Sequence, residues 1–269
     1  MKTTGNTILI TGGGSGIGQE LARRFNALGN TVIVAGRRKQ TLEETIAGRE
    51  GMHAMTLDVE DPGAIESFAK EIIAQHPSLN ILINNAGIMR RETLTETRDL
   101  YDAEQSITAN LLGPIRLTNA LTDHLVRQPD AVIVNVSSGL AFVPLSATPT
   151  YSATKAAIHS YTLSLREQLK GKVEVIELAP PGVQTELTPG QSTREGYMPL
   201  DAFIDETMTL FLQQPTPREV LVERVEFLRW AERDDRFDQA VEMLSTRSAR
   251  KDGAASHQKI RDQVEEMQT

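Results

Sequence analysis

The chain has 269 residues, enough to bury the core of a single α/β domain without disulfides. Its 36 acidic and 28 basic side chains give a net charge of −8, and no basic block stands out, so we expect no nucleic-acid partner. Cysteine is absent, which excludes disulfides, thiolate nucleophiles and cysteine metal sites. Neither an apolar signal segment nor an apolar run near the ~20 residues of a bilayer span occurs, so we expect a cytoplasmic protein with no membrane partner.

Six short apolar runs alternate along the chain with segments of helical spacing. The first run is followed by a glycine cluster and then by Ile17, Leu21 and Phe25 at the spacing of a helix. The predicted strands cover residues 7–10, 31–35, 52–57, 79–83, 131–136 and 173–178. Because these runs are apolar on both faces, they suit a parallel sheet covered on both sides. The sequence therefore predicts a doubly wound, Rossmann-type, three-layer α/β fold with about six strands.

The last third of the chain departs from this alternation. Residues 186–200 have the glycine, proline, serine and threonine content of a loop, which we expect to flank the substrate. Residues 217–247 have apolar residues at helical spacing and predict a C-terminal helical extension of one helix or two, with no evident seventh strand. We expect residues 1–247 to form a single catalytic domain and residues 248–269 to form a polar tail without assigned function.

A glycine-rich turn joins the first predicted strand to the first predicted helix. Glycines at this junction let the backbone approach a pyrophosphate, whose charge meets the free amides at the helix N-terminus. A simple tight turn is the alternative, but the position between strand and helix favours a dinucleotide site. The expected contacts are Gly12, Gly14, Ser15, Gly16, Ile17 and Gly18.

The glycine spacing T-G-x-x-x-G-x-G resembles that of the short-chain dehydrogenase/reductase family, and the resemblance covers roughly residues 6–190. The segment 84–87, Asn-Asn-Ala-Gly, matches a second family motif, and Asp58 matches a residue that contacts adenine. The end of the chain resembles a poorly characterised bacterial branch of this family. The resemblance implies further cofactor contacts from Asp58, Val59, Asn85, Ala86, Gly87, Tyr151, Lys155, Pro181, Val183 and Thr185.

The end of the second predicted strand bears on the choice between NADP and NAD. An enzyme that selects NAD usually has a carboxylate there, whereas a 2′-phosphate calls for arginine. Here Arg37 and Arg38 follow Gly36, and each guanidinium can hold a phosphate by paired hydrogen bonds. Solvated loop arginines are the alternative, and Ser15 stands where many NADP users have a basic residue. The sequence favours NADP, with NAD as the alternative.

Tyr151 and Lys155 are spaced so that a helix places them on one face. A free phenol has a pKa of ~10, and a nearby ammonium lowers it toward neutrality. Ser138 lies 13 positions before Tyr151, which is the family spacing. The resemblance implies that Ser138 binds the substrate oxygen, Tyr151 exchanges its proton, Lys155 binds the nicotinamide ribose and lowers the Tyr151 pKa, and Asn110 holds a water of a proton relay.

Two features depart from the family. Pro181 replaces a usual glycine, which removes an amide donor beside the nicotinamide. The missing seventh strand puts the usual tetramer in doubt, so we expect a homo-oligomer that is a dimer through the helices holding Asn110 and Tyr151.

We expect the substrate pocket to be bounded by residues 139–149 and 186–200. Leu140, Phe142, Val143 and Met198 are candidates for an apolar lining, with ordinary packing as the alternative. The histidines have no ligand-like spacing, so we expect no metal, and His159 is expected to pack beneath the site.

These observations predict an NAD(P)-dependent oxidoreductase that moves hydride to or from a carbonyl or alcohol carbon of a small organic substrate. A non-catalytic NAD(P)-binding sensor or scaffold is the main alternative, although such a protein has no need of Ser138, Asn110, Tyr151 and Lys155 together. A sugar-nucleotide epimerase needs a larger substrate domain, and a purely structural protein leaves the first 190 residues unexplained. Fold alone does not name the substrate.

Overall fold

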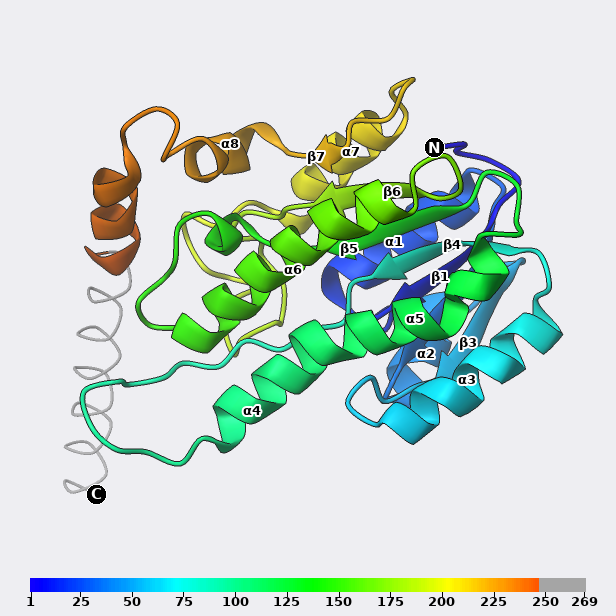
Figure 1. The fold of residues 1–269 in the computed structure, drawn as a ribbon, viewed down its shortest axis with the longest axis horizontal. Helices are drawn as coiled ribbons and strands as arrows, with labels where there is room; N and C mark the ends of the chain where they lie inside the picture. Colours follow the sequence, from blue (N-terminus) through cyan, green and yellow to red (C-terminus); the bar gives the residue numbers. More distant parts are fainter. Residues whose placement is uncertain (247–269) are drawn as a thin grey trace, which may run out of the picture.

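The computed structural model describes residues 1–246, which contain a single sheet of seven parallel strands (Figure 1). The spatial order is β3-β2-β1-β4-β5-β6-β7, so the chain changes direction across the sheet at β1 and β4. Ligands of such sheets bind outside the carboxyl ends of the strands at this switch point. The strands are β1 (Thr7–Thr11), β2 (Thr31–Gly36), β3 (Met52–Thr56), β4 (Leu79–Asn84), β5 (Val132–Val136), β6 (Glu174–Leu178) and β7 (Glu219–Val220).

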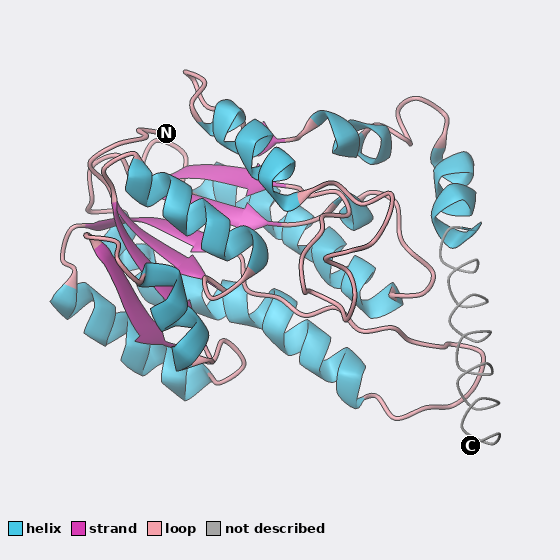
Figure 2. Ribbon diagram, turned by 180° about the vertical axis from the view of Figure 1, so that it is seen from behind, coloured by secondary structure: helices cyan, strands magenta, loops and turns pink. Residues whose placement is uncertain are grey.

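Helices cover both faces of the sheet (Figure 2). Alternate residues of β1 face opposite sides: Ile8 packs in the core that contains Phe25 and Phe203, whereas Leu9 packs in the core that contains Phe68 and Leu117. The helices are α1 (Gly16–Ala27), α2 (Lys39–Ile46), α3 (Pro62–Gln75), α4 (Tyr101–Ile107), α5 (Gly113–Leu125), α6 (Pro149–Gln168), α7 (Leu200–Phe211) and α8 (Glu223–Arg229). The predicted doubly wound, three-layer architecture is confirmed.

The structure has seven strands, one more than the sequence predicts. Strand β7 pairs in parallel with β6 through Glu177–Glu219 and Leu178–Val220. Two paired residues are too few to produce a period in the sequence, so the apolar pattern around them suggested helix instead. Residues 217–222 lie outside any helix. Helix α8 follows them, and after a turn a second helical segment covers residues 237–246.

Helix α7 was not predicted, because its sequence lies between the loop expected over 186–200 and the extension expected from 217. Its residues Phe203, Ile204 and Phe211 are fully buried against α1 and the sheet. The expected domain boundary at 247 and the tail 248–269 lie outside the described residues. Every helix in residues 1–246 is too short or too polar to span a bilayer.

Candidate active site

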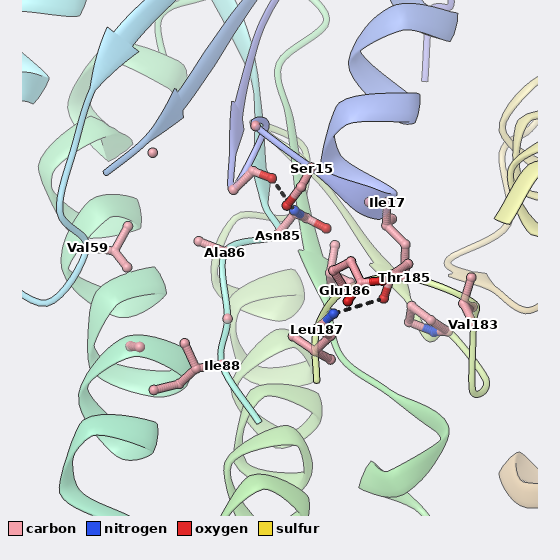
Figure 3. A pocket seen from close by; sticks show the side chains of 18 of the residues that line it. Ser15, Ile17, Val59, Asn85, Ala86, Ile88, Val183, Thr185, Glu186 and Leu187 are labelled. Carbon is pink, nitrogen blue, oxygen red and sulfur yellow. Dashed lines mark hydrogen bonds between the residues drawn. The ribbon is translucent and has the colours of Figure 1, made fainter. Parts of the chain in front are cut away.

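A cleft of about 580 Å³ opens at the carboxyl ends of the central strands (Figure 3). Most of the expected site residues line it: Gly12, Gly14, Ser15, Gly16, Ile17, Arg37, Arg38, Val59, Asn85, Ala86, Gly87, Ser138, Tyr151, Lys155, Pro181, Val183 and Thr185. Gly18, Asp58 and Asn110 do not line it. Further lining residues that the sequence did not indicate are Thr41, Leu42, Leu57, Glu60, Ile88, Arg90, Ala109 and Pro180. Glu186, Leu187 and Gln191, from the loop expected over residues 186–200, line the cleft as well.

The glycine turn depends on a close approach of two backbone segments. Gly12 has φ +67, and a Cβ there would lie 2.9 Å from the Cα of Ala86. Gly18 is the third residue of α1, where a Cβ would come 2.4 Å from Nδ2 of Asn85. Its absent side chain therefore lets helix and strand pack, which explains why Gly18 is away from the cleft.

The segment after β4 braces this turn. Thr11 Oγ1 accepts hydrogen bonds from the amides of Asn85 and Ala86, both at 3.1 Å. Asn85 Nδ2 donates to the carbonyl of Thr11 at 2.9 Å. These contacts fix the free amides at the start of α1, where Ser15 is the N-cap residue. That geometry suits an anion.

Beyond β2, Arg37 Nη1 forms an ion pair of 3.0 Å with Oε1 of Glu60. The Arg38 side chain is exposed and also lines the cleft. Asp58 does not face the cleft; its Oδ1 accepts from the amide of Glu60 at 3.0 Å and so positions the carboxylate that binds Arg37. This pair was not predicted from the sequence, because its members are 23 residues apart.

The two residues at the centre of the predicted chemistry lie on α6. Tyr151 and Lys155 are 7% and 5% exposed, and the Lys155 Nζ lies 5.6 Å from the centre of the Tyr151 ring. Lys155 Nζ donates to the Val136 carbonyl at 2.8 Å. Ser138 follows β5, and its Oγ accepts from the amide of Leu140 at 3.1 Å. Strand β5 and helix α6 thus bring the three side chains to one wall of the cleft.

Burial dominates the ionisation of both α6 groups. Burial raises the pKa of Tyr151 to about 12, a hydrogen bond with Ser138 opposes this rise, and Tyr197 adds to it. Burial lowers the pKa of Lys155 to about 8, against the attraction of Glu177. For Tyr151 the effect of burial outweighs the hydrogen bond to Ser138; the expected lowering of the Tyr151 pKa by Lys155 is not among these causes and stays a prediction.

Asn110 lies in a π-helical turn, Thr108–Leu112, between α4 and α5. Its side chain accepts from the amide of Ile88 and donates to the carbonyl of Ile88, both at 2.8 Å. The π turn thus clamps the segment that follows β4, consistent with the frequent occurrence of such turns at functional sites.

Pro181 lines the cleft beside the loop that follows β6. Gln191, which is 4% exposed, organises this loop: its Nε2 donates to the Val183 carbonyl at 2.9 Å and to Thr185 Oγ1 at 3.2 Å. Thr185 Oγ1 also accepts from the amide of Leu187 at 3.4 Å (Figure 3).

The candidate apolar lining is not part of this cleft. Val143 is fully buried in a core with Leu228, and the Phe142 ring lies beneath the guanidinium of Arg229. Leu140 does not line the cleft, and Met198 packs against the main core. The residues after Ser138 therefore hold the C-terminal helices. His159 contacts buried Glu177, with Nδ1 and Oε2 2.7 Å apart.

Comparisons with known proteins identify the family. The model of the family described as short chain dehydrogenase matches residues 6–196. Uncharacterized oxidoreductase DltE of Bacillus subtilis is 42% identical over 250 residues, which are 91% of this chain and 99% of that protein.

Solved structures agree on the fold. A short chain dehydrogenase from Burkholderia cenocepacia in complex with NADP has a TM-score of 0.78 at 23% identity, covering 91% of this chain and 100% of that one. A 3-ketoacyl-(acyl-carrier-protein) reductase from Brucella melitensis complexed with NADH has a TM-score of 0.72 at 26% identity, covering 82% of this chain and 97% of that one. The chain therefore belongs to the short-chain dehydrogenase family and is an NAD(P)-dependent oxidoreductase.

Proposed function

We propose that this protein transfers a hydride between NADP(H) and a carbonyl or alcohol carbon of a small organic molecule, with Tyr151 as the proton donor and acceptor. The observation that carries the proposal is the placement of Tyr151, Ser138 and Lys155 together at one wall of the cleft, with Tyr151 one helical turn from Lys155. A phenol placed in this way can give its proton to a carbonyl oxygen or take one from an alcohol. Ser138 holds that oxygen, and Lys155 binds the cofactor ribose.

The cleft fits a nicotinamide dinucleotide. The amides at the start of α1 suit the pyrophosphate, and Arg37 and Arg38 suit a 2′-phosphate. The cofactor supplies the hydride, while the chain orients the reactants and moves the proton. One solved relative is described with NADP and another with NADH. The arginines after β2, and the absence of an acid there, favour NADP.

We also propose a homodimer through α4 and α6. These helices present large exposed apolar side chains: Tyr101 is 62%, Ile107 40% and Leu163 42% exposed. Light scattering in solution tests this proposal, and a monomer at all concentrations would contradict it.

The test of the activity combines binding with turnover. Calorimetric titration with NADPH and NADH precedes a panel of ketones and aldehydes followed at the nicotinamide absorbance. Tyr151→Phe should lower turnover by about 10²- to 10⁴-fold and leave NADPH affinity within a few-fold. Tyr161→Phe is the matched control, because Tyr161 lies on the same helix and its hydroxyl bonds to Thr118 instead.

Three outcomes separate the alternatives. Turnover lost in Tyr151→Phe and kept in Tyr161→Phe supports the enzyme. Tight NADPH binding without turnover of any compound supports a sensor or scaffold. No binding of either dinucleotide overturns the proposal.

A further inference from the structure

A carboxylate is buried beneath the cleft on β6. Glu177 is fully buried and stands in register with Asn135 of β5, which in turn is in register with Asn84 of β4. The two asparagines are satisfied: Asn84 donates to Asn135 Oδ1 at 2.9 Å, and Asn135 donates to Thr162 Oγ1 of α6 at 3.0 Å. The row of polar side chains thus ends in an ionisable group under α6.

Only one oxygen of Glu177 has a hydrogen-bond partner. Oε2 lies 2.7 Å from Nδ1 of His159, whereas Oε1 is buried and has no partner among residues 1–246. A buried charge costs several kcal/mol unless it is paired, so a carboxylate at this position calls for cations around it. His159 supplies a hydrogen bond to Oε2, and Arg229 of α8 is a cation that Glu177 attracts.

Lys155 is a second cation in this neighbourhood. It precedes His159 by four residues on α6, so the two side chains share one face of the helix. Its Nζ donates to the carbonyl of Val136, the residue after Asn135. The ammonium therefore stands at the cleft end of the same strand pair, β5 and β6, that holds Glu177.

The remaining charges near this group have other partners. Glu219 of β7 binds Arg229 through two hydrogen bonds of 2.6 and 3.0 Å and lies close enough to attract His159. From α4, which also packs on α6, Asp102 pairs with Arg90 at 3.6 Å, and its side chain is 54% exposed. Tyr151, on α6 itself, bonds to Ser138. Within residues 1–246, Glu177 is thus the buried acid without a full set of partners.

We propose that Glu177, held in place by His159, supplies the buried negative charge that keeps Lys155 protonated, and that Glu177 is a positioning residue for the reaction at Tyr151. The proposal rests on the proposed function for its catalytic meaning. The effect of Glu177 on the charge of Lys155 does not depend on the proposed function, because that charge is measurable without turnover. A buried ammonium loses hydration, and an anion beneath it offsets part of that loss.

The test measures the ionisation of Lys155 directly. Competitive acetylation with acetic anhydride across pH, read by mass spectrometry of the Lys155 peptide, gives the midpoint of the amine in protein without added cofactor. Glu177→Gln keeps the size and removes the charge, and should lower this midpoint by about one pH unit. Glu219→Gln is the matched control, because it removes a neighbouring carboxylate that binds Arg229, and should leave the midpoint unchanged.

A second variant keeps the test valid if Glu177→Gln does not fold. Glu177→Met replaces the carboxylate by an apolar chain of similar length, an exchange that cores often tolerate. It should lower the midpoint as much as Glu177→Gln. In both variants the alkaline limb of the kcat/KM profile should move to lower pH by the same amount, while the values below about pH 6 stay near those of the native protein.

The outcomes are distinct. A midpoint that falls in the Glu177 variants alone supports the inference. A midpoint that stays the same in them, or that falls equally in Glu219→Gln, overturns it. If the midpoint falls but no compound turns over in the native protein, the electrostatic inference stands and the proposed function fails.

Discussion

Tyr151 and Lys155 lie one helical turn apart, yet burial shifts their pKa values in opposite directions. The pKa of the phenol rises to about 12 and the pKa of the ammonium falls to about 8, because a site of low polarity disfavours the charged form of each group. At pH 7 both side chains are therefore protonated. A protonated Tyr151 is the form that the proposed reduction of a carbonyl needs as its proton donor.

The first prediction concerns the pH dependence of reduction. The positive charge of Lys155 is present below its pKa of about 8 and is lost as the pH rises through that value. We expect kcat for carbonyl reduction to be nearly constant from about pH 6 to 7.5 and to fall above about 8. Initial rates at saturating substrate and NADPH measure this. Lys155→Arg should be slower, but its side chain stays charged at every pH tested, so its kcat should not fall above pH 8. A native kcat profile that is flat to about pH 9.5 would contradict the prediction.

The second prediction concerns cofactor choice. Arg37→Ala should weaken NADPH binding by about 10- to 100-fold, the worth of a charge-assisted hydrogen bond, and leave NADH binding unchanged. Glu60→Gln should tighten NADPH binding a few-fold, because it releases the guanidinium from its 3.0 Å ion pair. Arg38→Ala, measured in parallel by calorimetry, shows which arginine contributes more. Equal losses for both dinucleotides in Arg37→Ala would refute the assigned role.

Elements differ in how well the sequence predicts them. The six longer strands were predicted because each is a run of five or six residues between turn signals, and all but β3, in which Met52 alone is buried, are mostly buried. Strand β7 has two residues and exists only through its pairing with β6. The π turn at 108–112 has no sequence signal either, because it differs from an α-helix in hydrogen bonding rather than in composition.

Site residues also differ in how well the sequence predicts them. Glycines, Tyr151 and Lys155 have fixed spacings along the chain, so their sequence pattern was sufficient to predict that they meet at the cleft. Glu60 and Glu177 act through partners on other elements, and no local pattern indicates those partners. Gln191 binds Val183 and Thr185 of its own loop, and the composition of the loop does not show these contacts. Phe142 and Val143 were assigned to the wrong surroundings because α8, which covers them, was not placed by the sequence.

Helix α8 supports the segment that carries Ser138. A Cβ at Gly139 would lie 2.8 Å from Cδ1 of Leu228, so the two segments are in tight contact. Leu228→Ala should lower the free energy of unfolding by about 2–3 kcal/mol through lost burial and a cavity. It should also lower kcat several-fold, because the backbone beside Ser138 loses its support. Chemical denaturation and steady-state kinetics measure the two effects.

Leu212→Ala is the control for this third prediction. Leu212 follows α7 and is 47% exposed, so its truncation should change neither stability nor rate beyond small amounts. If Leu228→Ala destabilises the protein while kcat stays at the native value, α8 is a purely structural element.

The molecule as a whole assembles its cleft from distant parts of the chain. Residues between Gly12 and Gln191 line it, and they come from the carboxyl ends of six strands, from three helices (α1, α2 and α6), from the π turn and from the loop after β6. An unfolded chain cannot hold these groups together. Cofactor binding is therefore tied to the folded state, and the stability of the whole molecule reports on occupancy of the cleft.

NADPH at 100 times its Kd should stabilise the native protein by about 2.7 kcal/mol. For a chain of this size that corresponds to a rise in Tm of about 5–10 °C. In Arg37→Ala the same NADPH concentration should give a clearly smaller rise in Tm. Saturating NADH should raise the Tm of this variant as it does in the native protein, because the 2′-phosphate is the only difference between the two ligands. Scanning calorimetry or fluorimetry measures all four values. A rise with NADPH that Arg37→Ala leaves intact would show that the 2′-phosphate binds elsewhere, and Arg38 would then be the residue to replace.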